Sequence, residues 1–351
     1  MPERVSRQLV YLVYGGKPEY HQEAKYSILS VLHHAQGACP RILLYTDEPE
    51  QFLGWPVDLI VLDADTLKGW TGPASYLHRR KAAAIRDALQ YAEQSIFIDT
   101  DTFFLDSPVK LFERLAKAPW LVDEIEGVWK EYKGDALHDA LAPYLAERHG
   151  VDQQMLLINS GVLGFQDEAS GLMDEVLSLI DVMHPMVPKI HIIEQFAVGV
   201  AARHLGRPAE SRGVIKHYFS GKNYWRHLVA AFFQRHGEAF SALAVQAVRE
   251  MPTTKPRPVW WHRLNFRLRT LFLPSRVRSH AKLAYYAAVM RTDPYAEACG
   301  RGYAEELRRK AMPKGESLNG QPWSKVLSGP QKEHLARLLG EAVSGSSRDL
   351  S

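Results

Sequence analysis

The first hundred residues alternate short apolar runs with amphipathic segments, and this alternation constrains the fold more than any other feature. Runs rich in β-branched and aromatic residues cover residues 8–14, 41–45, 57–62 and 95–98. Between these runs, residues 23–34 and 79–91 place apolar side chains at helical spacing. Strands that alternate with helices form a mostly parallel sheet with helices on its faces. The sequence therefore predicts an α/β fold.

The rest of the chain continues this pattern and then becomes helical. We expect a helical insertion at residues 120–150, a buried strand pair at 155–165 and a late strand at 214–219. Beyond residue 225 the apolar spacing predicts helices. The predicted organisation is an α/β domain over residues 1–230, a basic helical region over residues 231–340 and a flexible tail over residues 341–351.

Cysteine content and hydropathy indicate in which cellular compartment the protein is expected. Cys39 and Cys299 are the only cysteines among 351 residues and match no zinc-binding spacing, which predicts a reducing compartment. The N-terminal residues lack the long apolar stretch of a secretory signal. No run reaches the ~18 apolar residues that a membrane-spanning helix needs. We therefore expect a cytoplasmic protein.

Two acids follow the fourth predicted strand, in the stretch SIFIDTDTFFLDSP at residues 95–108. Ligands of open α/β sheets bind beyond the carboxyl ends of the strands, which is where Asp99 and Asp101 stand. Residues i and i+2 of an extended segment face the same side, so both carboxylates can approach one point. Two close carboxylates repel, and a hard divalent cation such as Mg²⁺ or Mn²⁺ removes that conflict. In the alternative reading, Asp99 caps the strand and Asp101 starts a turn; Asp106 is a turn or cap residue in either case.

Four segments, in chain order, give the sequence a resemblance to a known family. They are residues 11–32, residues 79–88 followed by IFIDTDT, INSGVL at residues 158–163, and HYFSGKNYW at residues 217–225. With them the chain resembles the nucleotide-sugar glycosyltransferases of the GT-A fold, most closely family 8, the glycogenin and bacterial lipooligosaccharide galactosyltransferase type. The resemblance covers residues 8–226. It implies a Rossmann-like GT-A domain whose first half binds the nucleotide sugar and whose second half faces the acceptor.

The resemblance also implies a metal site and contacts to a nucleoside diphosphate. His217 would join Asp99 and Asp101 as the third ligand of Mn²⁺ or Mg²⁺. Lys222 would stabilise the diphosphate as it leaves, because a cation placed there favours the transition state over the ground state. Gly221 beside it lets the backbone approach a phosphate. The alternatives are a histidine packed at a strand end and a lysine in a solvated loop.

Four further residues are candidates for contacts to the nucleotide. Arg80 and Lys81 begin a helix, and cations at a helix N-terminus oppose the macrodipole unless an anion is bound there. The resemblance favours one of these two as a contact to the donor, whereas each one read alone is a solvated basic residue. Tyr14 and Gly15 follow the first predicted strand. The Tyr14 ring suits stacking on the base, and a tyrosine of the core is the alternative.

Two polar pairs are candidates for contacts to the sugar. Asn159 and Ser160 follow an apolar run and suit hydrogen bonds to sugar hydroxyls, although the same residues could form a tight turn. The resemblance places Glu194 and Gln195 at the donor sugar, with Glu194 close to the positive charge that develops on it. It implies a UDP-sugar donor, a glycan or lipid-linked acceptor and a retaining reaction.

Residues 255–282 interleave eight Lys and Arg with aromatic and aliphatic residues. Residues 251–351 carry 18 Lys and Arg against 8 Asp and Glu, whereas the whole chain carries 43 against 40, so residues 1–250 are acidic overall. Basic residues with apolar anchors favour an anionic membrane surface, here the inner face of the membrane. A basic helix packed on the α/β domain is the alternative. The same composition suits nucleic acid, but nothing else in the sequence supports that partner.

Two other functions stay open at this stage. Phosphatases of the haloacid-dehalogenase type also carry D-x-D after an apolar strand. They place Thr or Val two residues beyond the second acid, where this chain has Phe103, and they carry the motif on the first strand. A catalytically inactive GT-A protein that binds membranes is the other alternative, because Ser220 stands where the family has glycine.

Overall fold

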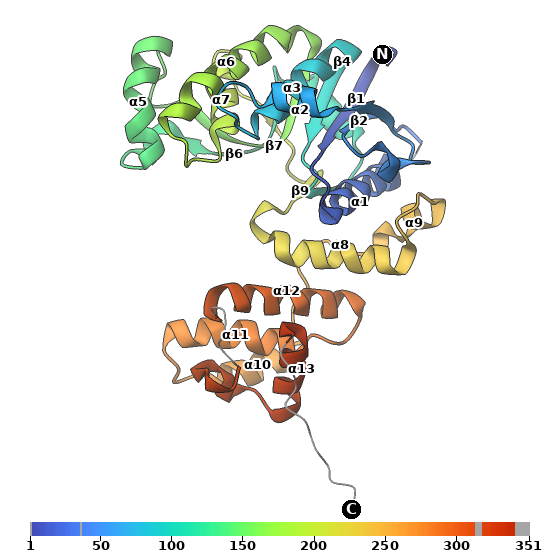
Figure 1. Cartoon of the computed structure of the whole chain (residues 1–351), viewed down its shortest axis with the longest axis vertical. Helices are drawn as coiled ribbons and strands as arrows, with labels where there is room; N and C mark the ends of the chain where they lie inside the picture. The colour runs from blue at the N-terminus through green and yellow to red at the C-terminus, as the bar shows by residue number, and fades with distance from the viewer. Residues whose placement is uncertain (1, 36, 313–317, 341–351) are drawn as a thin grey trace, which may run out of the picture. The chain divides into compact units, whose positions relative to one another are not determined.

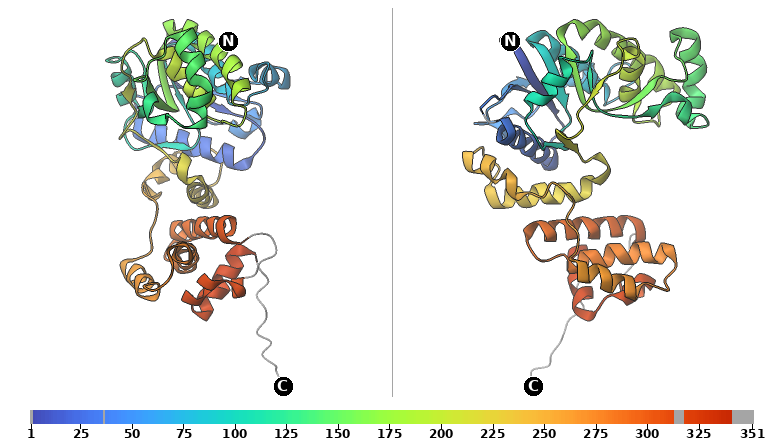
Figure 2. Two further views of the ribbon diagram at one scale, coloured as in Figure 1. Left: turned by 90° about the vertical axis from the view of Figure 1, so that its left-hand side faces the viewer. Right: turned by 180° about the vertical axis from the view of Figure 1, so that it is seen from behind.

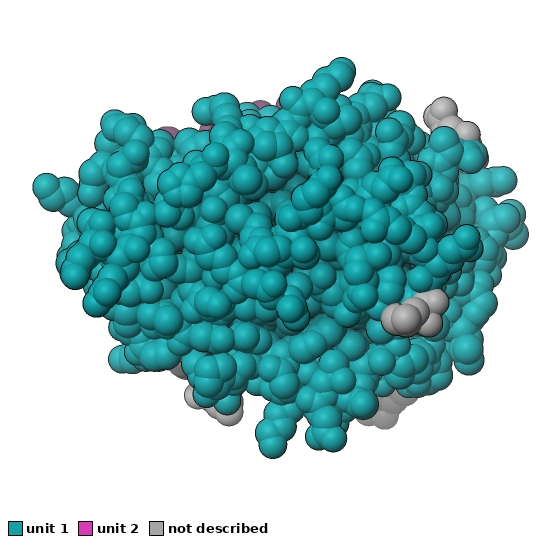
Figure 3. Space-filling model, turned by 90° about the horizontal axis from the view of Figure 1, so that it is seen from above, with its two compact units in different colours: residues 1–217, 239–246 teal, residues 218–238, 247–351 magenta. Residues whose placement is uncertain are grey.

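The fold was determined as a computed structural model that describes residues 2–35, 37–312 and 318–340. The predicted tail at residues 341–351 lies outside this part. The chain divides into two compact units, residues 1–217 with 239–246 and residues 218–238 with 247–351 (Figures 1 and 2). Figure 3 shows one face of the first unit in teal. The assignment of residues 1–230 to catalysis stays a prediction.

A seven-stranded sheet forms the centre of the first unit, in the order β3-β2-β1-β4-β7-β6-β8. Its strands are β1 (Val5–Val13), β2 (Arg41–Thr46), β3 (Asp58–Val61), β4 (Ala92–Ile98), β6 (Leu121–Val128), β7 (Leu156–Gln166) and β8 (Ala209–Glu210). Strands β3, β2, β1 and β4 run parallel, and so do β6 and β8. Only β7 runs antiparallel to its neighbours β4 and β6. The prediction of an α/β fold with a mostly parallel sheet is confirmed.

Helices cover both faces of this sheet, because apolar side chains alternate between the faces along each strand. The helices of the unit are α1 (Pro18–Ala35), α2 (Ala64–Trp70), α3 (Arg79–Ala88), α4 (Val109–Leu115), α5 (Ala136–His149), α6 (Ser170–Met186) and α7 (Ile193–Ala202). Val10, Phe97 and Leu163 face one core, which α3, α6 and α7 complete. On the opposite face α1 packs against β1, where Tyr11 Oη and Ser27 Oγ are 3.0 Å apart. The parallel strands are thus buried on both sides.

A second, two-stranded sheet follows β4. It pairs β5 (Thr102–Phe104) with β9 (Ile215–His217) in antiparallel register, Thr102 opposite His217. The chain bends at residues 99–101 between β4 and β5 instead of continuing as a strand. The extended geometry expected for Asp99 and Asp101 is therefore wrong, although both carboxylates still face one region.

Two predicted elements differ from the observed ones. The predicted helical insertion at residues 120–150 contains a strand, β6, before the helix α5, because residues 121–128 pair with β7 and β8, which no local pattern shows. The predicted strand pair at residues 155–165 is one strand, β7. Asn159 and Ser160 consequently lie inside a strand and not after one. Gly161 and Gly164 do not turn the chain; both lie where neighbouring side chains pack closely against the strand.

The second unit is helical, as the apolar spacing beyond residue 225 predicts. Its helices are α8 (Lys222–His236), α10 (Trp260–Arg269), α11 (Ser275–Val289), α12 (Pro294–Ala311) and α13 (Gly329–Leu339). The short helix α9 (Ala242–Ala247) spans the boundary between the two units. Helix α12 packs against α8, α11 and α13. Among the described residues, no helix combines the length and the apolarity that crossing a membrane would require.

Candidate functional site

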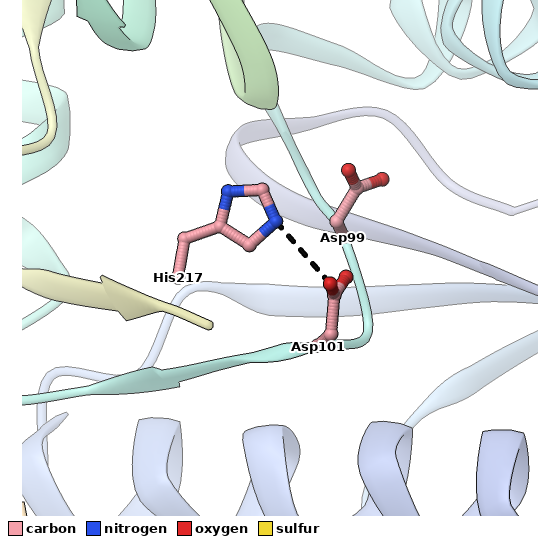
Figure 4. A group of neighbouring side chains, drawn as sticks. All are labelled: Asp99, Asp101 and His217. Carbon is pink, nitrogen blue, oxygen red and sulfur yellow. Dashed lines mark ion pairs between the residues drawn. The ribbon is translucent and has the colours of Figure 1, made fainter. Parts of the chain in front are cut away.

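The two acids of the D-x-D triplet lie at the carboxyl end of β4 (Figure 4). The Asp99 backbone N–H donates to the carbonyl oxygen of Gly161 on β7 at 2.8 Å, which continues the sheet ladder by one bond. The Thr102 hydroxyl donates to the Asp99 carbonyl oxygen at 2.8 Å and closes the bend. These two bonds fix the backbone on both sides of Asp101, whose side chain is buried.

The pairing of β5 with β9 brings His217 to this bend. Because Thr102 lies opposite His217, the imidazole reaches the residue just before Thr102, and its Nε2 lies 3.4 Å from Asp101 Oδ2. Figure 4 shows this contact as a dashed line, with the Asp99 carboxylate beside it. One ligand atom from each of Asp99, Asp101 and His217 lies within 4.8 Å of the others. The three residues predicted as metal ligands are therefore neighbours.

Asp123 on β6 orients the histidine, and the sequence analysis missed it. His217 Nδ1 lies 2.7 Å from Asp123 Oδ2, and Ser211 Oγ donates to Asp123 Oδ1 at 2.8 Å. Burial lowers the pKa of His217, but hydrogen bonds to Asp101 and Asp123 outweigh burial and raise it to about 9. A carboxylate on the far nitrogen of a histidine fixes its tautomer and is typical of metal sites. Nε2 is thereby left to face Asp101 and Asp99.

Gly161 makes room for the histidine. A Cβ atom built at this position would overlap Cε1 and Nδ1 of the His217 ring. The ring therefore lies close to the backbone of β7 at Gly161, whose carbonyl group accepts from Asp99. Only glycine permits this approach without displacement of the ring.

Lys81 contacts Asp99, the acid of the pair that does not face the dashed contact with His217 (Figure 4). Its ammonium group lies 3.2 Å from Asp99 Oδ2, 3.0 Å from Ser160 Oγ and 2.5 Å from the Ser160 carbonyl oxygen. Burial lowers the pKa of Lys81, but the charges of Asp99 and Glu194 raise it above its usual value overall. The lysine is thus a charged, buried group that positions Asp99.

Ser160 connects the metal-facing residues to helix α7. Its hydroxyl donates to Glu194 Oε2 at 3.0 Å, and its N–H donates to Gln195 Oε1 at 3.2 Å. Glu126 on β6 joins this group, since it accepts from Asn159 Nδ2 at 3.0 Å and from Gln195 Nε2 at 3.1 Å. The structure therefore brings together Lys81, Ser160, Glu194, Gln195 and, through Glu126, Asn159.

Glu194 is the buried carboxyl group of this cluster. Burial raises its pKa to about 7, although the Lys81 charge opposes that rise. Its Oε2 accepts from Ser160, whereas its Oε1 is buried without a hydrogen-bond partner among the described residues. A buried oxygen of this kind costs free energy unless a ligand satisfies it. Glu194 can therefore accept a hydrogen bond from a bound hydroxyl group.

The turn after β1 lies at the same carboxyl edge of the sheet as the end of β4, because the two strands run parallel. Gly15 and Gly16 adopt positive φ angles of 93° and 67°, which the turn requires. The Gly15 N–H donates to the Asp47 carboxylate at 3.2 Å, so an acid from the end of β2 lies at this turn. The Arg80 guanidinium lies over the Tyr14 ring, 4.6 Å from its centroid. No local pattern in the sequence marks Asp47, because it follows the neighbouring strand β2 and reaches Gly15 only in the folded sheet.

Gly221 and Lys222 belong to the second unit. The Gly221 N–H donates to the Tyr218 carbonyl oxygen at 2.9 Å, and Lys222 begins α8. Their predicted contact with a diphosphate stays a prediction.

The side-chain donor atoms of Asp99, Asp101 and His217 suit a hard divalent cation. Two carboxylates and one imidazole whose far nitrogen is held by Asp123 match the ligand types of Mn²⁺ or Mg²⁺. Three protein ligands leave positions that a substrate oxygen can take. The group therefore fits the metal expected from the sequence, with Asp99, Asp101 and His217 as ligands.

No model of a protein family and no curated protein sequence matches this chain. Similar solved structures include mouse xyloside xylosyltransferase 1 in its apo form, at 14% identity over 59% of this chain and 85% of that chain, with a TM-score of 0.40. They also include the galactosyltransferase LgtC in complex with donor and acceptor sugar analogs, at 11% identity over 71% of this chain and 97% of that chain, with a TM-score of 0.41. Both of these neighbours are glycosyltransferases.

The close packing at Gly161 predicts the effect of adding one methyl group. Gly161→Ala should lower the free energy of unfolding by about 1–3 kcal/mol, because the ring of His217 or the strand must move. Urea denaturation measures this change. Gly171→Ala is the control, since nothing lies within 4 Å of its added Cβ atom on α6, and it should be neutral or stabilising. Equal stability of Gly161→Ala and the wild type would contradict the described packing.

The raised pKa of Glu194 predicts a pH-dependent stability. The Glu194 carboxyl group has a pKa of about 7 in the folded protein and an ordinary pKa of 4.5 in the unfolded chain. Between these two pH values the folded protein holds a proton that the unfolded chain has lost. The free energy of unfolding of the wild type therefore falls as pH rises from 4.5 to about 7. Glu194→Gln should remove this loss, and its advantage over the wild type should grow by about 3 kcal/mol across that window. Denaturation at several pH values measures the difference. The control is Glu93→Gln, which removes an exposed carboxylate from the same unit and should change the free energy of unfolding by less than about 0.5 kcal/mol.

Proposed function

We propose that the chain is a metal-dependent glycosyltransferase of the GT-A type. It moves a sugar from a nucleoside diphosphate sugar, UDP-sugar above all, to a glycan or lipid-linked acceptor. The observation that carries this proposal is the convergence of Asp99, Asp101 and His217 at the carboxyl end of β4. Ligands of open α/β sheets bind at this edge, and these donor atoms suit a cation that binds phosphate oxygens.

The proposed donor lies along the edge from β1 to β7. Tyr14 stacks on the base, with Arg80 on the other face of its ring, and Asp47 accepts a hydrogen bond from the base. Uracil offers a ring N–H to such an acceptor, whereas cytosine does not, and this supports a UDP-sugar. Asn159, Ser160, Glu194 and Gln195 face the sugar. The buried Glu194 Oε1 supports this assignment, because a sugar hydroxyl would satisfy it.

The reaction breaks the bond between the sugar and the diphosphate, so negative charge grows on the leaving diphosphate. A divalent cation held by Asp99, Asp101 and His217 supplies compensating positive charge there. Lys81 fixes the Asp99 carboxylate, and Asp123 fixes the imidazole, so both ligands are oriented before the donor arrives. Lys222 with Gly221 adds a second cation to the diphosphate, as the resemblance of HYFSGKNYW implies. Retention of the sugar's configuration is proposed on the same resemblance.

Nucleotide binding tests the proposal directly. The purified chain is titrated with UDP, GDP and CDP, each with and without Mn²⁺. We expect Mn²⁺-dependent binding with a preference for UDP, and its loss in Asp101→Asn, because one of three ligands is removed. Asp106→Asn is the matched control, since Asp106 is half-buried, pairs with Lys110 and is not among the three candidate ligands. No nucleotide binding under any condition would refute the proposal, and binding without hydrolysis or transfer from any UDP-sugar would favour the inactive alternative.

The role of Asp123 gives a second test. Asp123→Asn should weaken Mn²⁺ binding about 10- to 100-fold, because the carboxylate no longer orients and polarises His217. Calorimetric titration with Mn²⁺ in the absence of nucleotide measures this affinity, and circular dichroism confirms that the variant is folded. An unchanged affinity in a folded Asp123→Asn protein would show that His217 does not hold the ion through Nε2.

A further inference from the structure

A large basic pocket lies within the second unit, among α10, α11 and α12. Its volume is about 1030 Å³, in the upper range of small-molecule sites. The buried rings of Phe266, Tyr286 and Tyr303 contribute to its wall. Six basic side chains also line it, namely Lys255, Arg257, Arg263, Arg267, Arg278 and Lys282. No acidic residue lines the pocket.

Aromatic rings, and not carboxylates, meet part of the positive charge of this pocket: Lys255 lies over the Tyr224 and Tyr303 rings, and Lys282 lies over the Tyr286 ring. Within the described ranges, none of the six basic side chains forms an ion pair with a carboxylate. Glu306, whose charge acts on Lys255, is bonded to Arg309 and Lys310 instead. Like charges that line one cavity repel one another. An anion bound in the cavity would therefore reduce this electrostatic repulsion and stabilise the folded unit.

Hydroxyl groups and a helix end add donors to the same cavity. Ser275, Arg278 and Ser279 line it from the first two turns of α11, a helix of 15 residues. The N-terminal end of a helix carries partial positive charge and suits phosphate groups. Arginine side chains bind phosphate oxygens through two parallel hydrogen bonds. The pocket thus has the donor chemistry for a ligand with phosphate groups.

An exposed apolar stripe runs along α10 beside this pocket. Trp260, Leu264 and Leu268 are spaced by four residues and share one face of the helix. Leu271 and Phe272 continue the apolar surface beyond the helix end, and Phe272 is 93% exposed. Six of the fifteen exposed large apolar side chains of the described residues fall between residues 260 and 272. A contiguous apolar surface of this kind marks an interaction site.

We propose that this pocket binds the phosphate-bearing headgroup of a membrane lipid, while the stripe of Trp260, Leu264 and Leu268 enters the apolar layer beneath the headgroups. The basic pocket and the apolar stripe share helix α10, since Arg263 and Arg267 of the pocket alternate with Leu264 and Leu268 of the stripe. A soluble phosphate compound would fill the pocket but leave the stripe in water. A bilayer with anionic lipids satisfies both. This binding site is separate from the proposed transferase site and does not depend on it.

Cosedimentation of the full chain with lipid vesicles tests the proposal. Vesicles of phosphatidylcholine alone are compared with vesicles of phosphatidylcholine and phosphatidic acid, in EDTA to exclude binding through the candidate metal site. We expect binding only to the vesicles with phosphatidic acid. Removing two basic side chains near an anionic surface in Arg263→Gln/Arg267→Gln should weaken that binding roughly 30-fold.

A variant with the same change of charge outside the pocket distinguishes binding in the pocket from general attraction to the positive charge of the unit. Arg249→Gln/Arg276→Gln removes two exposed arginines of the same unit that do not line the pocket, so it should retain most of the binding. Leu264→Ser/Leu268→Ser should weaken binding to the vesicles but leave binding of soluble inorganic tripolyphosphate unchanged, because that ion needs only the pocket. These exposed positions should not disturb folding, which circular dichroism checks.

Three results would overturn the proposal. Failure to bind phosphatidic acid vesicles removes it outright. Equal weakening in the two arginine variants would show that the attraction is to net charge and not to the pocket. Binding of tripolyphosphate without binding of vesicles, or binding of single-stranded RNA more tightly than of vesicles, would assign the pocket to a soluble or nucleic-acid ligand.

Discussion

The buried ammonium group of Lys81 is the interaction on which the site of the first unit depends. It joins α3, which carries it, to the end of β4 through Asp99 and to the middle of β7 through Ser160. Ser160 then contacts the first turn of α7 through Glu194. A buried charge is tolerated only where opposite charges and hydrogen bonds compensate it. The need to satisfy one lysine therefore aligns four secondary-structure elements, α3, β4, β7 and α7, around the candidate site.

The same edge has more acids than bases. Asp99, Asp101, Asp123 and Glu194 are close together, with Lys81 and His217 as the opposing groups. Two pKa shifts reduce this excess: hydrogen bonds to Asp101 and Asp123 raise the pKa of His217 despite its burial, and burial raises the pKa of Glu194. Both shifts are typical of sites that are completed by a ligand. The excess is a physical reason for a cation at the D-x-D bend that holds without any family resemblance.

Much of this architecture could be predicted from the sequence, because local patterns determine it. The apolar runs before Asp99 and the helical spacing around Lys81 are local patterns. They predict the order of strands and helices and the position of Asp99 at the end of a strand. Asp123, Glu126 and Asp47 could not be found in this way, because their positions depend on which strands are neighbours and in what register. The predicted strand pair at residues 155–165 is wrong for the same reason, since the ring that packs on Gly161 comes from a distant part of the chain.

The short pairing of β5 with β9 has a consequence for how the site assembles. Each strand has three residues, and such a pair has little stability of its own. It nevertheless joins residues 102 and 217, so bringing the imidazole to Asp101 carries the entropic cost of closing a long loop of chain. An ion that bridges Asp101 and His217 would bind only the folded chain and would shift the folding equilibrium by mass action. Metal binding and completion of the fold would then be one thermodynamic event.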